Sequence, residues 1–299
     1  MELRRTREIL ERHGIRLQKS LGQNFLIDES VPRRTATAAI YGVAGLDAED
    51  VSADGTDGTA VAALEIGPGA GALTAELAAR ADKVVAIELD SRMIPVLGET
   101  LSEFSNVEIV EGDALKVDIA ALVSEKFAGM RAVAAANLPY YLTTPLIEKL
   151  LECRKFERVC VMVQKEVAQR IVAKPGSGEY GSFSVYCKYY AEPKILFGVS
   201  PGSFLPPPKV ASAVVMFDCR RGRPEGVESE EDEKRLFRLW RAAFSERRKK
   251  LAGLAAREFG ISRESVETAL AAMGLSPDVR GERLSLEQFI ELSSCIRDV

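Results

Sequence analysis

Short apolar runs alternate with amphipathic segments from residue 60 to residue 173. The runs are rich in Val, Ile and Ala, which is typical of buried strands. They lie at Val61–Ile66, Lys83–Leu89, Val107–Val110, Ala132–Ala136 and Val159–Val163. Strands that are apolar on both faces and separated by helices are typical of a parallel sheet that is covered on both sides. The pattern therefore predicts an α/β fold.

The segments between these strands carry apolar residues at helical spacing. The helices that this spacing predicts are Leu73–Arg80, Arg92–Phe104, Pro145–Glu152 and Lys165–Ala173. After residue 174 the alternation stops, and the stretch around Tyr186 and Tyr190 is compatible with either a helix or a strand. Two later apolar runs, Ile195–Val199 and Ala213–Phe217, flank a proline-rich loop and could pair as an antiparallel hairpin.

Composition divides the chain into two domains. Residues 219–233 are polar, charged and short of apolar side chains, as in a linker. Residues 234–299 show helical spacing throughout. We therefore predict an α/β domain over residues 1–218, a linker over 219–233 and a small all-helical domain over 234–299. At 299 residues, the chain is long enough for two domains.

Two segments of the first domain differ from its main pattern. Residues 1–20 have the sequence of a basic amphipathic helix, in which arginines are interleaved with leucines and isoleucines. Residues 45–59 are acidic and rich in glycine, as in an exposed loop before the first strand. A solvated insertion is the simplest interpretation of this loop, because its sequence carries no functional motif.

The composition excludes several classes of protein. Hydrophobic residues make up 46% of the chain, which is enough to bury a core. No run approaches the roughly 18–20 apolar residues of a membrane-spanning helix, and no apolar run of a secretory signal follows the basic N-terminus. The five cysteines are scattered, which argues against a disulfide framework and a metal site. We therefore expect a cytoplasmic protein that binds neither a membrane nor a metal ion.

A glycine cluster follows the first strand and opens a helix. Gly67 and Gly69 let the backbone turn tightly and let a ligand approach the helix N-terminus. About twenty residues later, Glu88 ends the second strand, where an acid can accept hydrogen bonds from ribose hydroxyls. Two cofactors fit this pattern. The looser NAD fingerprint uses these glycines with Ala72, and the acidic motif of S-adenosylmethionine enzymes begins with Glu65; a tight turn without any ligand is the third interpretation.

Asp113 follows the third predicted strand. Its carboxylate is expected at the carboxyl edge of the sheet, where ligands of such folds bind. There it could accept a hydrogen bond from the amino group of an adenine. A turn or helix cap is the alternative role for this aspartate.

The fourth predicted strand runs into the string Asn137-Leu138-Pro139-Tyr140, which is the most informative one in the chain. The exocyclic amine of a nucleobase is a poor nucleophile because its lone pair is delocalised into the ring. An asparagine oxygen and a nearby backbone carbonyl can both accept hydrogen bonds from such an amine, which favours its pyramidal geometry. Pro139 restricts the turn, and the ring of Tyr140 offers a face on which a flipped base can stack. The four residues are therefore candidate catalytic residues for methyl transfer to a base.

Five motifs occur in an order that resembles one family of RNA methyltransferases. They are Lys19–Leu26, Glu65–Gly71, Gly112–Ala114, Asn137–Pro145 and Phe204–Ser212. Over nearly its whole length, the chain is similar to the small-subunit ribosomal RNA adenine dimethyltransferases of the kasugamycin-resistance type. The resemblance implies a Rossmann-like S-adenosylmethionine-dependent methyltransferase sheet with a helical C-terminal domain. It also implies transfer of two methyl groups to each of two adjacent adenines near the 3′ end of small-subunit (16S) rRNA.

The resemblance also implies roles for individual residues. The cofactor contacts that it implies are Asn24, Leu26, Gly67, Gly69, Glu88, Asp113 and Asn137. Tyr140 and Phe204 would flank the target adenine. Each stack of a base on an aromatic ring contributes about 1–3 kcal/mol, which offsets much of the few kcal/mol needed to unstack the base.

The densest basic run is Arg247-Arg248-Lys249-Lys250, which we expect on a helix after Phe244. A solvated helix face is the usual meaning of such a run. With an rRNA substrate, these cations would contact phosphates and orient the RNA, while the pocket selects the base. The net charge is −4, but an acidic protein can still present a basic face. The expected partner is small-subunit rRNA within the immature 30S subunit, bound by a monomeric enzyme.

Three alternatives remain open at this point. A macrolide-resistance type methyltransferase would act on large-subunit rRNA with the same fold and cofactor, although the Phe204–Ser212 loop and the C-terminal segment favour the small subunit. A non-catalytic assembly factor would only bind RNA, but the intact segment Asn137–Tyr140 argues against it. An NAD-dependent oxidoreductase needs a Tyr/Lys or His/Asp pair for hydride transfer, and none is evident in the sequence.

Overall fold

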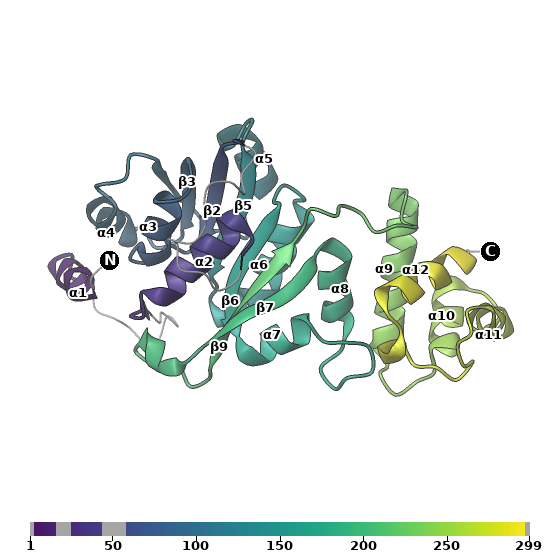
Figure 1. The fold of residues 1–299 in the computed structure, drawn as a ribbon. Helices are drawn as coiled ribbons and strands as arrows, with labels where there is room; N and C mark the ends of the chain where they lie inside the picture. Colours follow the sequence, from purple (N-terminus) through teal and green to yellow (C-terminus); the bar gives the residue numbers. More distant parts are fainter. Residues whose placement is uncertain (1–2, 16–24, 44–57, 297–299) are drawn as a thin grey trace. The chain divides into compact units, whose positions relative to one another are not determined.

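The structure is a computed structural model, drawn in Figure 1. It describes residues 3–15, 25–43 and 58–296. Several predicted features therefore lie wholly or partly outside the described residues: residues 1–2 and 16–20 of the basic segment, Lys19–Asn24 of the first motif, and the acidic loop 45–59 up to residue 57. The described part of the chain forms two compact units that interleave in the sequence.

The first unit consists of residues 1–168 and 193–220, and the second of residues 169–192 and 221–299. This division differs from the predicted boundary at residue 218, because residues 169–192 group with the C-terminal helices. Composition could not reveal this, since residues 169–192 resemble the α/β domain in their mixture of apolar and polar side chains.

A seven-stranded sheet forms the centre of the first unit (Figure 1). Its strands are β2 (Val61–Ile66), β3 (Lys83–Glu88), β4 (Val107–Glu111), β5 (Arg131–Asn137), β6 (Arg158–Gln164), β7 (Glu192–Val199) and β9 (Ser212–Asp218). Their order across the sheet is β4-β3-β2-β5-β6-β9-β7. The pairs among β2 to β6 are parallel, and β9 runs antiparallel to β6. The predicted parallel α/β sheet is confirmed, and β7 and β9 are neighbours, as their apolar runs suggested.

Helices bury the sheet. The helices of the first unit are α1 (Leu3–Arg12), α2 (Ser30–Tyr41), α3 (Ala72–Ala78), α4 (Met93–Thr100), α5 (Ile119–Lys126) and α6 (Thr143–Glu152). Helix α7 (Lys165–Ile171) crosses the boundary between the two units at residue 168. Ile40 of α2 and Leu77 of α3 share one buried cluster with Ala63, Val133 and Cys160 of the strands. Successive residues of a strand point to opposite faces. Because all six residues of β2 are buried, the sheet is covered on both faces.

Helix α2 is an element that the hydrophobic pattern did not reveal. Its sequence alternates threonine with alanine, so no amphipathic stripe stands out. The structure nevertheless buries Thr35 and Thr37 together with the alanines. The Thr35 hydroxyl donates to the carbonyl of Val31 at 2.8 Å, which satisfies it inside the helix.

The C-terminal end of α2 is held by an arginine from the sheet. Arg158 begins β6, is 5% exposed, and donates through Nη1 to the carbonyls of Ala39 and Ile40. Carbonyls in the last turn of a helix have no partner within the helix, so this arginine supplies one. Gly42 follows with a φ of 75°, and a Cβ at this position would lie 2.7 Å from Arg158 Nε.

The order of the strands reverses at β2. Strand β3 lies on one side of β2 and β5 lies on the other. Ile66 pairs with Ala136 in the β2–β5 ladder, and Gly67 and Asn137 come directly after this pair. Since the chain leaves the two strands in opposite directions, a crevice opens between them at their carboxyl ends. The fold therefore brings the glycine loop and the Asn137–Tyr140 segment to one place.

A small second sheet joins two distant parts of the sequence. Strand β1 (Phe25–Leu26) pairs antiparallel with β8 (Phe204–Leu205), and Leu26 lies opposite Phe204. The backbone N–H of Ile27 adds a bond of 2.9 Å to the carbonyl of Ser203. Leu26, which the sequence predicts at the cofactor, and Phe204, which it predicts at the target base, are thus paired with each other.

The second unit is helical. Its helices are α8 (Ser182–Tyr190), α9 (Glu230–Ser245), α10 (Leu251–Phe259), α11 (Arg263–Ala272) and α12 (Leu286–Cys295). The tyrosine-rich stretch that the sequence left undecided is helix α8. The ring of Tyr189 lies 5.0 Å from that of Phe237 and 5.8 Å from that of Trp240, between ring centroids. Within the described ranges, no helix is long and apolar enough to cross a membrane.

Helix α9 begins earlier than predicted and ends earlier than predicted. It starts at Glu230, inside the expected linker 219–233, because Ser229 and Asp232 form a reciprocal capping box. It ends at Ser245, so the basic run lies in the turn between α9 and α10. The prediction that this run is helical was wrong: the buried face of α9 stops at Ala243, and Arg247 and Lys250 instead bond to other segments of the unit from a turn.

The contact of Gly42 with Arg158 generates a stability prediction. We expect Gly42→Ala to lower the free energy of unfolding by about 2 kcal/mol or more, because an L side chain is strained at this φ and its Cβ displaces the guanidinium. Gly129→Ala is the matched control, since Gly129 has a φ of 78° but open space around its Cβ position. In the control, the free energy of unfolding should fall by only about 1 kcal/mol. Urea unfolding measures both, and equal losses would contradict the role of Arg158.

Candidate active site

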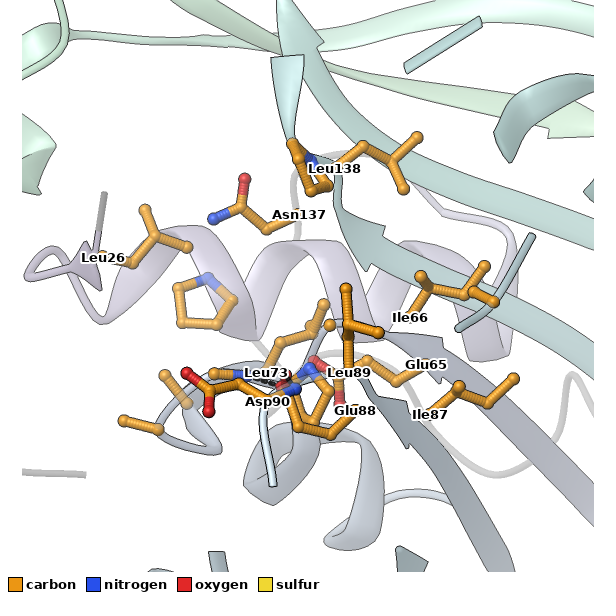
Figure 2. A pocket seen from close by; sticks show the side chains of 18 of the residues that line it. Leu26, Glu65, Ile66, Leu73, Ile87, Glu88, Leu89, Asp90, Asn137 and Leu138 are labelled. Carbon is orange, nitrogen blue, oxygen red and sulfur yellow. Dashed lines mark hydrogen bonds between the residues drawn. The ribbon is translucent and has the colours of Figure 1, made fainter. Parts of the chain in front are cut away.

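A cavity of about 990 Å³ opens at the carboxyl edge of β2, β3 and β5 (Figure 2). This is the upper end of the usual range for ligand sites. Every predicted pocket residue that the structure describes lines it: Leu26, Gly67, Gly69, Glu88, Asp113, Asn137, Leu138, Pro139, Tyr140 and Phe204. The sequence prediction of one shared pocket is therefore consistent with the fold.

The glycine loop forms one part of the cavity wall. The N–H of Gly67 donates to the carbonyl of Ile87 at 3.0 Å, which ties the loop to β3. Gly67 and Gly69 have φ values of 69° and 57°, where glycine is favoured. No atom lies within 4 Å of a Cβ placed on Gly67, so the backbone there faces open space. A Cβ on Gly71 would lie 3.1 Å from Leu101, so this glycine instead permits close packing on the segment after α4.

Glu88 ends β3, and the backbone already orients its carboxylate. Its Oε1 accepts from the N–H of Asp90 at 2.8 Å, and its Oε2 accepts from the N–H of Gly69 at 3.3 Å. Burial raises the pKa of Glu88, and these two N–H donors oppose the rise. A carboxylate has about four acceptor positions, so Glu88 keeps acceptor capacity for a hydroxyl donor such as that of a ribose.

Glu65 is a buried acid on β2. It is 1% exposed, and its Oε2 has no hydrogen-bond partner among the described residues. Burial raises the pKa of Glu65 to about 8; the nearby Glu88 adds to the rise and Thr74 opposes it. Buried polar atoms are normally hydrogen-bonded. The unpartnered oxygen is consistent with the raised pKa, because an ionised carboxylate there would be a buried charge without a donor.

The cavity is strongly acidic. Eight acids and one base line it: Glu11, Asp28, Glu29, Glu65, Glu76, Glu88, Asp90, Asp113 and Arg92. Three of the acids are in ion pairs: Asp90 with Arg92 at 2.6 Å, Glu76 with Arg80 at 2.7 Å and Asp113 with Lys116 at 3.7 Å. Such a cavity repels the pyrophosphate of NAD and attracts the sulfonium and ammonium charges of S-adenosylmethionine. The residues present fit S-adenosylmethionine, and the excess of acids favours it over NAD, the other cofactor that the glycine loop alone left open.

Asn137 is the last residue of β5. Figure 2 shows its carboxamide extending from the strand into the open space of the cavity, while the side chain of Leu138 points the other way. Leu138 is 2% exposed, and its N–H donates to the carbonyl of Met162 at 3.2 Å. The backbone that carries Asn137 is therefore anchored in the sheet, and the carboxamide oxygen can serve as an acceptor at a fixed position.

Pro139 and Tyr140 continue the chain in an ordered turn. The carbonyl of Pro139 accepts from the hydroxyl of Thr143 at 3.2 Å. The hydroxyls of Tyr140 and Ser212 share a hydrogen bond of 2.9 Å, which fixes the Tyr140 ring relative to β9. The ring is half-buried and borders the cavity, so one face can receive a planar ligand.

Phe204 borders the cavity from β8, but it is almost fully buried. It is 3% exposed and packs in a cluster with Val31, Met162 and Val214. Because these apolar neighbours cover most of the ring, only a small part of it faces the cavity. Its pairing with Leu26 still fixes its position there.

Asp113 has the turn role that its sequence allowed, and it also borders the cavity. Its Oδ1 accepts from the N–H of Leu115 at 3.0 Å, and its backbone carbonyl accepts from the N–H groups of Lys116 and Val117. It is therefore a turn residue that also lines the cavity. A contact with an adenine amino group stays a prediction.

Asp28 is a cavity residue that sequence reasoning missed. Its Oδ1 accepts from the hydroxyl and the N–H of Ser30 at 2.6 and 3.1 Å, and its Oδ2 accepts from the Ser203 hydroxyl at 3.2 Å. The Ser30 hydroxyl is the main reason that the pKa of Asp28 lies below its usual value. Asp28 thus joins the start of α2 to the turn before Phe204. The helix-start signal is visible in the sequence, but the partner 175 residues away is not.

Arg247 and Lys250, two residues of the predicted basic run, bond to other residues of the second unit. Arg247 donates through Nε to Glu282 at 2.9 Å and through Nη2 to the carbonyl of Gly178 at 2.7 Å. Lys250 donates to Asp278 at 2.5 Å. These contacts tie the turn after α9 to other segments of the same unit, so the two cations already serve its structure.

Comparisons with known proteins agree with this chemistry. A family model described as ribosomal RNA adenine dimethylase matches residues 14–298. The chain is 43% identical to the ribosomal RNA small subunit methyltransferase A of Geobacillus thermodenitrificans, over 98% of this chain and 95% of that protein. It is 42% identical to the protein of the same description from Shouchella clausii, over 98% and 94% of the two chains.

Two solved structures resemble the chain along most of its length. A dimethyladenosine transferase from Plasmodium falciparum matches with a TM-score of 0.69 and 25% identity, over 90% of this chain and 95% of that one. The 23S rRNA methyltransferase ErmE matches with a TM-score of 0.68 and 25% identity, over 91% and 99%. Both names describe enzymes that methylate, which accords with the donor that the acidic cavity favours.

The burial of Glu65 generates a prediction about pH. The pKa of Glu65 is raised to about 8 in the folded protein from an ordinary value of 4.5. The neutral acid is therefore favoured by folding, so its contribution to stability is present below pH 4.5 and is lost as the pH rises through 8. Glu65→Gln stays neutral and escapes this loss.

Urea unfolding of the cofactor-free protein at pH 5.5 and pH 8.5 measures the effect. From the lower to the higher pH, Glu65→Gln should gain about 1 kcal/mol or more in stability relative to the unchanged protein. Glu103→Gln, at an exposed position, is the control and should show no such gain. A parallel pH dependence of Glu65→Gln and the unchanged protein would contradict the burial argument.

Proposed function

Because the chain belongs to the ribosomal RNA adenine dimethylase family, we propose that it transfers methyl groups from S-adenosylmethionine to the exocyclic amines of two adjacent adenines near the 3′ end of small-subunit rRNA. The products are two dimethyladenines, formed while the small subunit is assembled. The names of the relatives from Geobacillus and Shouchella support the small-subunit substrate.

One observation carries this proposal. The β2–β5 pairing sets the Asn137 carboxamide beside the glycine loop, in a cavity whose lining has more acids than bases and therefore suits a cationic donor. A non-catalytic RNA-binding protein has no need for an acceptor oxygen at this point. The described site therefore favours an enzyme over an assembly factor that retains only the fold.

The proposed reaction needs hydrogen-bond acceptors more than it needs an acid or a base. When bound, S-adenosylmethionine supplies a methyl group on a positively charged sulfur. The Asn137 oxygen and the backbone carbonyl of Leu138 accept hydrogen bonds from the adenine amine, which localises the nitrogen lone pair. A bond forms from nitrogen to carbon as the carbon–sulfur bond breaks. The alkylated nitrogen is then strongly acidic and loses its proton to water.

Tyr140 and Phe204 are proposed to flank the adenine during transfer. Tyr140 is half-buried, whereas Phe204 is 3% exposed. We therefore expect Tyr140 to supply most of the stacking surface. Asn24, Leu26, Gly67, Gly69, Glu88 and Asp113 are proposed to hold the cofactor. By the same resemblance, we propose that the enzyme is a cytoplasmic monomer that binds the immature 30S subunit.

Large-subunit rRNA is the second candidate substrate. ErmE matches the fold almost as well as the dimethyladenosine transferase does, with TM-scores of 0.68 and 0.69. The 42–43% identity to small-subunit enzymes favours the first candidate. Incubating the purified protein with immature small subunits or with 23S rRNA separates the two, and methylation of 23S rRNA alone would refute the proposal.

Asn137→Ala tests the catalytic role of the carboxamide. We expect kcat for methyl transfer to fall by at least about 100-fold, because removing one well-placed hydrogen-bonding group from a reacting centre has an effect of this size. Tyr140→Ala should cost less, about 10- to 100-fold, in line with one stacking contact. Circular dichroism and thermal melting serve as folding controls for both variants. Undiminished turnover by Asn137→Ala would rule out the mechanism.

Arg248 and Lys249 are the proposed phosphate contacts of the basic run. Both side chains are exposed, and neither has a hydrogen bond or ion pair with another side chain in the part of the chain that the structure describes. This sets them apart from Arg247 and Lys250. Exposed cations of this kind position RNA without reading its sequence.

The salt dependence of RNA binding tests this assignment. Changing Arg248 and Lys249 to Ala should weaken rRNA binding and make the plot of log K against log salt shallower by about 0.7 to 0.9 per lost contact. Arg241→Ala, at another exposed cation of the same unit, is the comparison for a general effect of charge. An unchanged slope in the double variant would remove both residues from the RNA interface.

A further inference from the structure

The N-terminal helix is part of the cofactor cavity, although it lies outside the glycine and asparagine motifs. Leu10, Glu11, Gly14 and Ile15 line the cavity. They belong to the end of α1 and the turn after it. Residues 10–15 lie far in the sequence from the glycine and asparagine motifs, so contacts with another element must position them at the cavity.

Apolar packing supplies one part of that hold. Ile9 and Leu10 are 1% and 4% exposed, and they share a buried cluster with Met93 and Leu97 of α4. Figure 1 shows α1 beside α4. Among the described side chains of α1, Ile9 and Leu10 therefore pack the helix against α4.

Two side chains at the end of α1 converge on one carboxylate of α4. Arg12 Nη1 donates to Glu99 Oε1 at 2.6 Å, and His13 Nε2 lies 3.0 Å from Glu99 Oε2. The hydrogen bond from His13, with the charge of Arg12, holds the pKa of Glu99 below its usual range, so this carboxylate is ionised at neutral pH. Both oxygens of Glu99 are engaged, so polar contacts hold the end of α1 to α4 beside the apolar ones.

The turn after α1 transmits this restraint to the cavity. Gly14 has a φ of 67°, its N–H donates to the carbonyl of Glu11, and the N–H of Ile15 donates to that of Leu10. These two bonds and the contact of Ile15 with the cluster around Leu10 make a Schellman motif. Residues 10–15 are thus one rigid piece, clamped by Arg12 and His13 at its middle.

We propose that Glu99 is a positioning residue for the cofactor: it clamps residues 10–15 as one wall of the cavity and thereby slows the escape of S-adenosylmethionine. Glu99 itself does not line the cavity. It acts through Arg12 and His13. The proposal rests on the methyl donor alone and is independent of which RNA is methylated.

Direct binding of S-adenosylmethionine, without RNA, tests the clamp. Partly exposed ion pairs are weak, so Glu99→Gln should raise the Kd by about three- to fivefold, mainly through faster dissociation. In steady-state assays, KM for S-adenosylmethionine should rise while kcat at saturation stays unchanged. Trypsin should also cut after Arg12 faster in this variant. Glu103→Gln, an exposed glutamate four residues along, is the matched control and should behave like the unchanged protein.

Charge reversal separates the clamp from a general effect on folding. Glu99→Arg places a cation against Arg12 and His13 and should raise the Kd by about tenfold or more, and adding Arg12→Glu should restore much of the affinity. Equal Kd values for Glu99→Gln and Glu103→Gln, or no recovery in the double variant, would overturn the proposal while leaving the function untouched. Failure of the unchanged protein to bind S-adenosylmethionine would instead overturn the cofactor and the clamp together.

Discussion

The parallel pairing of β2 with β5 is the constraint on which the rest of the site depends. Ile66 lies opposite Ala136 in this ladder, and a shift of one residue would turn every side chain of a strand to the opposite face of the sheet. Because both faces are buried, the register is strongly specified by packing. Gly67 and Asn137 follow the last pair of this ladder. The small apolar residues that build the core therefore also determine where the glycine loop and the Asn137 carboxamide meet.

The cavity and the surface differ in charge, and this difference bears on which ligand each can bind. Burial raises the pKa of both Glu65 and Glu88, and a positive charge placed nearby lowers the pKa of such an acid again. A cationic donor and a neutral base can enter such a cavity, whereas the phosphates of RNA are repelled by it. This is compatible with the proposal that exposed cations such as Arg248 contact the RNA backbone. The net acidity of the chain and its proposed RNA substrate are thus compatible.

Most of the candidate site could be predicted from the sequence because its residues directly follow buried strands. In a parallel sheet, the positions after such strands gather at one edge by geometry alone, so Gly67, Glu88, Asp113 and Asn137 were predictable once the strands were found. The residues that could not be predicted act through partners far away in the sequence. Asp28 illustrates this, since its role depends on a serine that no local pattern connects to it.

The sequence by itself determined the parallel sheet, the glycine loop and the acceptor asparagine, because each depends on the local period of apolar residues or on the conformational freedom of single residue types. Only the tertiary structure decided that residues 169–192 join the helical unit, that the basic run lies in a turn, and that α1 forms a wall of the cavity. These features depend on which side chains meet across long stretches of chain, such as Tyr189 with Trp240 or Arg12 with Glu99. Contacts of that kind leave no periodic trace in the sequence.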